Sequence, residues 1–544
     1  MKRNKLLVLS VVLTLVMTIL AACTGGQSNQ QPTQGAQSGP QVGGSLVIGI
    51  TGDPYNIATW LSNDLNASMV MNLAMPPLMA TDDNGNKVPY IIEDYDISDD
   101  AKVYTVKIHD GLTWHDGKPF TTDDLAFTCE YVAKYKLGYG ADMYGGVEKT
   151  EIVDKTTIKY YLKQPQVNFL SQIGFWVDVM PKHIYETVTD PMNFQFNGVG
   201  YGPYKLVDYK KGEYYSFERV PDWPLANDGK GAYIENVTFR IFPDANALIL
   251  AMKNGEVQVS GSALPAAAQN QLESTPDKFG IMRVNSLGFG YISFNYKNEL
   301  LKDINVRKAF AMTVDRDALV TTAMQGAAIK METPVSPVYA DLVKSQIKFP
   351  GFDVEGAKKA LEAAGYTDKD NDGVRESSSG KKLEFELIYR TTTANADSIA
   401  NVIKANAEQA GFKLNLKPVD PATYTDRVTQ QKSYDINFID WGVIDDPDSS
   451  LSTIYASNAA LNFMGYKNDK IDQLLAASMK EPSFEERIKI MDEFQKEFVN
   501  ELPTVNAWVR VNAYGFSKEY EGWDLTPGLY GVVDIKDLVK VYKK

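Results

Sequence analysis

The stretch TWHDGKPFTTDDLAF, residues 113–127, brings together the side chains that first suggest chemistry. His115 lies beside Asp116, and an imidazole next to a carboxylate can act as a general base. The chain has two other histidines, His109 and His183, and His109 stands six residues before His115, across the end of a predicted strand and a turn. That spacing suits two ligands of one metal ion poorly, so we expect a scaffold role for this stretch.

Motifs that would support catalysis or metal binding elsewhere are missing from the sequence. It contains no GxSxG turn to present a nucleophile, no CxxC pair and no HExxH helix. We therefore predict a protein without catalytic residues, without a bound metal ion and without a cofactor.

A cluster of acids, Asp445, Asp446 and Asp448, follows a predicted strand at residues 434–441. Ligands of open parallel sheets favour the crevice beyond the carboxyl ends of strands, so residues 441–448 are the best site candidate that the residues alone offer. Two of the acids could serve a glycosidase, which needs carboxylates about 5 to 9 Å apart. A charge that awaits a cationic group of a ligand is the stronger functional alternative, and solvated acids are the structural one.

A second acidic loop, DKDNDGVRESSS, has the spacing of the start of a calcium loop in Asp368, Asp370 and Asp372. The twelfth position, where a bidentate Glu would complete the oxygen shell, is Ser379. We favour a turn rich in Asp and Gly over a calcium site.

The elements that must position these residues follow from periodicity. Strands are predicted at residues 45–50 and 103–108, and Thr121 with Asp124 matches a capping box at a helix start. Residues 113–127 are therefore predicted as strand end, turn and capped helix. Cys129 falls on the apolar face of that helix, which predicts a buried core thiol.

The second half of the chain shows a clearer order. A strand at 382–390, a helix at 396–410 and a strand at 413–419 predict a right-handed βαβ unit with parallel strands. A helix around 422–431 and the strand at 434–441 follow, and Ser483 with Glu486 marks a later helix start, again as a capping box.

The amino terminus predicts export. Residues 1–22 have a basic start and an apolar run too short for a full membrane span, which indicates a signal peptide. Its end, Leu-Ala-Ala-Cys, resembles the lipobox of bacterial lipoproteins, which implies cleavage before Cys23 and lipidation of that residue. Residues 23–44 then comprise Cys23 and a flexible tether of 21 residues with a span of about 25 Å. The alternative is an ordinary cleaved signal with a coincidental cysteine.

Length and charge bound the remaining body. Residues 1–22 carry three positive charges and no acid, so their removal takes the formal charge from −14 to −17 and leaves 522 residues. Such a length favours more than one lobe, and such a charge argues against nucleic acid as a partner. With Cys23 acylated, Cys129 has no intramolecular partner, so stability must come from core burial.

Six stretches together resemble one family, the extracytoplasmic solute-binding proteins of ABC importers, in the group for oligopeptides and dipeptides (solute-binding protein family 5). They are YTVKIHDGLTWHDGKPFTTDDLAF, GVGYGPYKLVDY, NVTFRIFPDANALILAMKNGEV, DINVRKAFAMTVDRDAL, DVEGAKKALEAAGY and YDINFIDWGVIDDPD. The likeness covers the body from about Gly44 and keeps the order of the family.

The resemblance implies a two-lobed α/β fold of the periplasmic-binding-protein type with hinge crossovers. Lobe I would span 45–290, with an extra subdomain at about 67–196, lobe II would span 291–515, and 516–544 would return to lobe I. Ligand would lie between the lobes of a monomer, and the permease subunits of an ABC importer would read the closed form. The lipid on Cys23 would hold the protein on the outer face of the cell membrane, or on the periplasmic side where an outer membrane exists.

The resemblance also implies site residues. The segment matching DWGVIDDPD supplies main-chain bonds to ligand and an aspartate that pairs with its free amino group in peptide-binding relatives. Trp441 and Gly442 match that motif directly. The loop is about one residue shorter than the common pattern, so Asp445 is the choice for the aspartate and Asp440 the runner-up.

Two aromatic side chains near the crossings, Tyr291 and Trp60, could wall the cleft, although either could equally be core. An oligosaccharide receptor of the same family would need such stacking faces more than it needs Asp445. From a different class, a secreted hydrolase using Asp445 and Asp446 is the remaining alternative. We expect a receptor, most simply for oligopeptides, without enzymatic activity.

Overall fold

The structure is a computed structural model that describes residues 40–544 except 62–63, 139, 343–346, 443–445 and 529. The predicted signal peptide, Cys23 and most of the tether lie outside the described residues. In the described part of the chain we find no helix with the length and apolar character needed to cross a bilayer.

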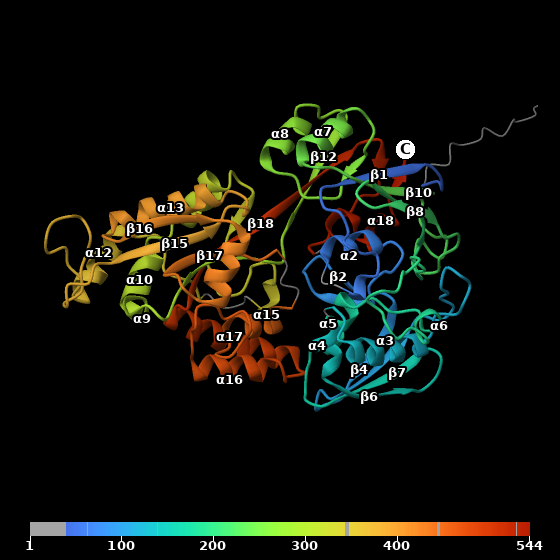
Figure 1. Cartoon of the computed structure of the whole chain (residues 1–544), viewed down its shortest axis with the longest axis horizontal. Helices are drawn as coiled ribbons and strands as arrows, with labels where there is room; N and C mark the ends of the chain where they lie inside the picture. Colours follow the sequence, from blue (N-terminus) through green and yellow to red (C-terminus); the bar gives the residue numbers. More distant parts are fainter. Residues whose placement is uncertain (1–39, 62–63, 139, 343–346, 443–445, 529) are drawn as a thin grey trace, which may run out of the picture. The chain divides into compact units, whose positions relative to one another are not determined.

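A small antiparallel sheet includes the strand that precedes residues 113–127 in the chain. Its strand order is β4 (Ile92–Ile97), β5 (Val103–Ile108), β7 (Thr157–Leu162), β6 (Val147–Ile152). Helix α3 (Thr122–Tyr135) contacts β6 and β7, and α4 (Gly140–Gly145) and α5 (Phe169–Trp176) follow (Figure 1). The predicted strand at 103–108 and the capping box of Thr121 and Asp124 are both confirmed.

The predicted core thiol also lies in this region. Cys129 is 4% exposed and belongs to the hydrophobic core, as its place on the apolar face of α3 indicated. Burial raises the pKa of the Cys129 thiol to about 12.

A twelve-stranded sheet contains the rest of the main strands. In its first half β1 (Ser45–Ile50) pairs in parallel with β10 (Asn236–Ile241) and β11 (Val259–Ser260). Antiparallel strands β9 (Tyr214–Arg219) and β8 (Tyr204–Lys210) extend it to one edge, and β12 (Phe279–Asn285) pairs with β18 (Thr504–Ser517). Helices α7 (Ala245–Lys253) and α8 (Ala266–Glu273) accompany this half (Figure 1).

The second half of the sheet contains the predicted βαβ unit. Strand β15 (Glu384–Arg390) is parallel to β16 (Lys413–Val419) and to β17 (Ile436–Asp440), and α13 (Ala396–Gln409) connects β15 to β16 and packs on both (Figure 1). Strand β13 (Gly290–Phe294) pairs with β17 and β18, and β14 (Ala328–Lys330) pairs with β18. The helix expected around 422–431 is α14 (Pro421–Tyr424) continued by a π-helical turn at Thr425–Gln430.

The other elements are short or flank these sheets. The longer helices are α10 (Ile304–Met312), α12 (Val354–Ala363), α15 (Pro447–Tyr455), α16 (Asp469–Ser478) and α17 (Phe484–Glu501). The short helices are α2 (Leu65–Met71), α6 (Lys182–Tyr185), α9 (Glu299–Lys302), α11 (Arg316–Ala318) and α18 (Ile535–Leu538), and the short strand pairs are β2 (Met79–Thr81) with β3 (Lys87–Pro89) and β19 (Tyr520–Glu521) with β20 (Tyr542–Lys543).

Two large hydrophobic cores divide this fold. One runs from Leu46 to Val284 and is completed by Tyr514 to Val541, and the other runs from Leu287 to Val509. We call the parts around them lobe I and lobe II. The chain passes from one core to the other between β12 and β13 and again within β18, which pairs with β12 in lobe I and with β13 in lobe II.

A buried arginine ties together several chain segments of lobe II. Arg307 on α10 is 2% exposed, and its guanidinium donates to the carbonyl oxygens of Leu301, Lys302, Glu501 and Leu502 at 2.7 to 3.0 Å. These carbonyls lie at the carboxyl ends of α9 and α17, where helices leave acceptors unpaired and favour a positive charge.

We expect Arg307→Lys to lower the free energy of unfolding by about 3 kcal/mol, since an ammonium cannot satisfy four diverging carbonyls in a buried place. Urea unfolding would show a lower midpoint with an unchanged slope. The matched control is Lys308→Arg, which changes the neighbouring exposed residue of the same helix. Equal stability of Arg307→Lys and the wild type would contradict this account of the arginine.

Candidate functional site

The predicted site begins at the carboxyl end of β17, where Asp440 is the last strand residue. Its carboxylate forms an ion pair with Arg510 Nε and accepts a hydrogen bond from Trp508 Nε1 at 3.2 Å, both from β18. The side chain of Asp440 is 8% exposed, and burial raises its pKa although Arg510 opposes the shift. Asp440, the second choice for the aspartate that pairs with a ligand amine, is thus already paired with Arg510.

The next two residues form hydrogen bonds to the crossover between β12 and β13. Trp441 N donates to Phe289 O at 3.1 Å, and Gly442 O accepts from Ser286 Oγ at 2.6 Å. A Cβ at Gly288 would lie 1.8 Å from Trp441 O, so this close approach of two main chains requires glycine. Two main-chain groups of the predicted ligand segment are therefore used to hold the segment against the hinge.

The two aromatic residues predicted as cleft walls lie in the cores. Tyr291 is fully buried in lobe II, and burial raises its pKa well above the ordinary value. Trp60 is 4% exposed in lobe I and packs edge-on against Tyr185 and Phe196, with ring centroids 5.3 and 4.8 Å away. Contact of either with a ligand stays a prediction.

The structure describes two of the three aspartates that follow Gly442. Asp445, the chosen partner of a ligand amine, lies outside the described residues. Asp446 caps α15, and its Oδ1 accepts hydrogen bonds from Ser449 N at 2.9 Å and from Asn168 Nδ2 at 3.3 Å. Asp448 is fully buried and forms an ion pair with Arg487 of α17. Asp446 and Asp448 thus have structural partners, which disfavours a hydrolytic acid pair here.

A cavity that the sequence analysis missed lies at the carboxyl ends of β1 and β10 in lobe I. Its volume is about 590 Å³, and its lining includes Tyr55, Phe194, Tyr209, Lys211 and Tyr215. The rings of Tyr209 and Tyr215 are stacked with centroids 5.6 Å apart, and Tyr55 is 74% exposed. The preference of ligands for the carboxyl ends of parallel strands, which singles out residues 441–448 after β17, also points to the loop after β1 that holds Tyr55.

The cluster around His115 is explained by folding. His115 Nδ1 accepts from Gly200 N at 3.1 Å, and Nε2 contacts Gly202 O at 3.0 Å, which fits a neutral imidazole that donates from Nε2. Burial lowers the pKa of His115 to about 4, so the ring is neutral at pH 7. Asp116 pairs with His183 at 2.7 Å. The imidazole joins two loops, in agreement with a scaffold role.

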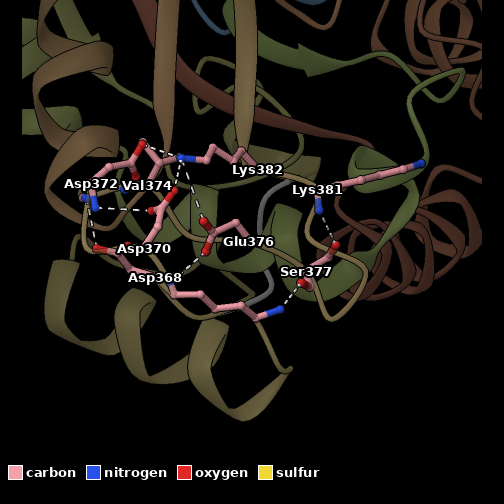
Figure 2. A network of polar contacts seen from close by, with 10 residues as sticks. Asp368, Asp370, Asp372, Val374, Glu376, Ser377, Lys381 and Lys382 are labelled. Carbon is pink, nitrogen blue, oxygen red and sulfur yellow. Dashed lines mark hydrogen bonds and ion pairs between the residues drawn. The ribbon is translucent and has the colours of Figure 1, made fainter.

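The acidic loop that resembles a calcium loop is paired with a lysine that follows it in the chain. Carboxylate oxygens of Asp368, Asp370, Asp372 and Glu376 lie within 4.8 Å of one another. As Figure 2 shows, Lys382 Nζ lies against this group, 2.8 Å from Asp370, in contact with Asp372 and 3.9 Å from Glu376. The ammonium offsets the repulsion that such a cluster would otherwise cause, which supports the interpretation as a turn.

Two α/β lobes, two chain crossings between them and a loop held at the hinge define a two-lobed solute-binding protein. Residues 86–462 match the family model of the bacterial extracellular solute-binding proteins, family 5. The chain belongs to this family, whose members are binding proteins that work outside the cytoplasm.

Individual relatives extend the likeness over nearly the whole chain. The oligopeptide-binding protein AppA of Bacillus subtilis is 27% identical over 543 residues, which cover 97% of each chain. The structure of AppA in complex with a nonapeptide has a TM-score of 0.71, and the match covers 93% of this chain and the whole of the AppA chain in that structure.

Two further solved structures are similar. The ABC transporter substrate-binding protein CtaP of Listeria monocytogenes is 28% identical with a TM-score of 0.80, and covers 92% of this chain and all of CtaP. NikZ of Campylobacter jejuni in complex with Ni(L-His) is 25% identical with a TM-score of 0.74, over 92% of this chain and 99% of NikZ.

The His115 geometry predicts a pH effect on stability with a definite sign. Its pKa in the folded protein, about 4, is below the ordinary value near 6.5, so between these pH values the unfolded chain binds a proton that the folded protein does not. Stability therefore falls as the pH falls through this window, by about 3 kcal/mol at most. His115→Ala should be less stable at pH 7.5 and should lack this part of the slope.

Because other acids titrate in the same range, the quantity to compare is the difference in free energy of unfolding between wild type and variant at each pH. Ligand affinity at pH 7.5 should be unchanged. If His115→Ala kept full stability but lost ligand binding, the cluster would belong to the site and the scaffold interpretation would be wrong.

Proposed function

We propose that this protein is an extracytoplasmic receptor that binds oligopeptides between its two lobes and delivers them to the permease of an ABC importer, without catalytic activity. The observation that carries the proposal is the likeness to AppA along 97% of both chains, since the AppA structure holds a nonapeptide. A monomer suffices for this role.

Binding energy would act through the equilibrium between open and closed lobes. A ligand that contacts both lobes favours the closed form, and it shifts the population only by the difference in its affinity for the two forms. The hinge suits this role because the site segment is fastened to the crossover by Phe289 and Ser286, so movement of lobe I and placement of the segment are connected.

Charge would supply selectivity for a free amino terminus. Asp440 is paired with Arg510, and Asp446 and Asp448 have partners of their own. Asp445, the choice that the family resemblance implies, is the carboxylate that we propose for the ligand ammonium. In a closed cleft, such a charge-assisted hydrogen bond favours a charged amine, whereas an uncharged end would leave the carboxylate unpaired.

We expect Asp445→Asn to weaken a free-amine nonapeptide about 10- to 100-fold, in the range of a hydrogen bond to a charged group, and to change an amino-acetylated peptide little. Titration calorimetry with the two peptides measures both affinities. The exposed aspartate Asp426 of lobe II provides the control variant, Asp426→Asn, which should bind like wild type. Equal losses for both peptides would remove the amine role of Asp445.

A receptor for another solute is the second candidate, since NikZ holds a metal–amino acid complex and exposed tyrosines surround the lobe I cavity. The experiment that separates these functions is to purify residues 43–544, denature them and identify released small molecules by mass spectrometry. Released peptide supports the proposal, and released glycan or metal complex supports the alternative. Turnover of peptide or glycan that depends on Asp445 and Asp446 would instead indicate a hydrolase.

We also propose that a lipid on Cys23 anchors the protein, with residues 24–44 as the tether. Several acyl chains on one residue give stable membrane binding, which one chain does not. Cys23→Ala should therefore move most of the protein from the membrane fraction to the soluble fraction of the exporting host. Mass spectrometry of the wild-type amino-terminal peptide should show acyl groups, and a peptide without acyl mass would contradict the anchor.

A further inference from the structure

Polar side chains connect two helices that belong to different cores. Helix α5 contributes Phe169, Leu170 and Ile173 to the core of lobe I, whereas α15 contributes Leu451 and Ile454 to that of lobe II. Between these helices, Gln172 Nε2 donates to Ser449 Oγ at 2.6 Å and Asn168 Nδ2 donates to Asp446 Oδ1 at 3.3 Å. A main-chain bond from Val167 N to Met479 O, 3.0 Å long, lies beside them.

On the lobe I side, a further hydrogen bond orients the side chain of Gln172. Gln172 Oε1 accepts a hydrogen bond from Gln166 Nε2 at 2.9 Å, which turns the amide nitrogen of Gln172 toward Ser449. The main chain of Gln166 is held in turn, because its main-chain carbonyl oxygen accepts a hydrogen bond from Tyr104 Oη at 2.5 Å. A side chain whose rotamer is already fixed loses little entropy when it makes a further bond.

The lobe II side is equally rigid. The first turn of α15 is capped by Asp446, and Asp448 in that turn is fully buried and receives Arg487 Nε of α17 at 2.9 Å. Helix α15 begins at Pro447, five residues after Gly442, the residue bound to the crossover through Ser286. The turn that α5 contacts therefore overlaps the end of the proposed ligand segment.

We propose that Gln172 and Asn168 form a clasp between the lobes that positions the first turn of α15 in the closed protein and slows ligand release. The slowing of release rests on the proposed function, but the clasp itself does not. These bonds are made by groups on different lobes, so separation of the lobes must break them. The bond from Gln172 to Ser449 is neutral, and the bond from Asn168 to the Asp446 carboxylate is long at 3.3 Å. Two such bonds have modest net strength, so the clasp favours closure without making it irreversible.

Loss of the two side-chain bonds should lower the ratio of closed to open protein about 10-fold. The variants are Gln172→Leu and Asn168→Ala, singly and together. Asn168 makes no side-chain capping bond within α5, so its replacement leaves the helix start as it was. Ser171→Ala is the matched control, because Ser171 Oγ bonds to Asn168 O within the same segment.

The readout is the distance distribution between spin labels at Glu148→Cys in β6 and Lys470→Cys in α16, in a Cys129→Ser background. Both label positions are exposed. Measurements without ligand and with a synthetic nonapeptide pool give the closed fraction, and stopped-flow release of the pool gives the dissociation rate. We expect a smaller closed fraction and about 10-fold faster release in the double variant, with the control and the melting temperatures unchanged.

A double-mutant cycle with Ser449→Ala tests the contact from the other lobe. If Gln172 acts through Ser449, the effects of Gln172→Leu and Ser449→Ala on the closed fraction are not additive. Additive effects, an unchanged closed fraction, or a wild type without a closed population in either condition would each overturn the clasp. If the nonapeptide pool does not bind, the proposal of a peptide receptor fails. The double-mutant cycle on the closed fraction without ligand still tests the clasp.

Discussion

The hydrogen-bond ladders of β18 are the constraint on which the rest of this structure depends. One strand of fourteen residues pairs with β12 at its carboxyl-terminal part and with β13 and β14 at its amino-terminal part. Backbone groups that are buried must find partners, so this strand joins two separately packed cores at a fixed register. The same strand carries Trp508 and Arg510, which fix the end of β17 through Asp440. The place of the site segment is therefore determined by pairing in the hinge.

In both the hinge and lobe II, charged side chains have nearby partners that balance them. Arg307 is matched by carbonyls at two helix ends, Asp440 by Arg510, Asp448 by Arg487, and the acidic loop by Lys382. A chain with a formal charge of −14 repels itself as a whole, so it gains from pairing the carboxylates that lie close together. Among the described residues of the site segment, Asp440, Asp446 and Asp448 all have partners, so an unpaired carboxylate there would be the more selective for a cationic ligand group.

Sequence reasoning predicted the local elements well where periodicity and caps agree. The βαβ unit of β15, α13 and β16 follows from strand alternation and helical spacing, and the Thr121 and Asp124 cap is set by residues three apart. The π-helical turn after α14 was not predicted, since its hydrogen-bond pattern differs from that of an α-helix by one residue only. The resemblance to a family gave the two lobes, which local patterns alone do not contain.

The site was harder to predict because its contacts are distant in the sequence. No local pattern around Asp440 predicts its ion pair with Arg510. None around Asp446 predicts its hydrogen bond with Asn168, which is 278 positions away. Tyr291 and Trp60 are large aromatic residues near the crossings, a position that does not tell a core side chain from a cleft wall. Glycine at 288 gave no signal either, because the neighbour that requires it, Trp441, belongs to the segment after β17.

The single cysteine of the described chain bears on how the protein survives outside the cytoplasm. Compartments there are oxidising, and a thiolate is the species that attacks a disulfide. With a pKa near 12 and 4% exposure, Cys129 is almost never a thiolate and is shielded from other chains. In the folded protein Cys129 therefore resists disulfide formation without help from a reductant. Unfolding exposes that thiol, so each unfolding event in an oxidising medium risks an irreversible cross-link.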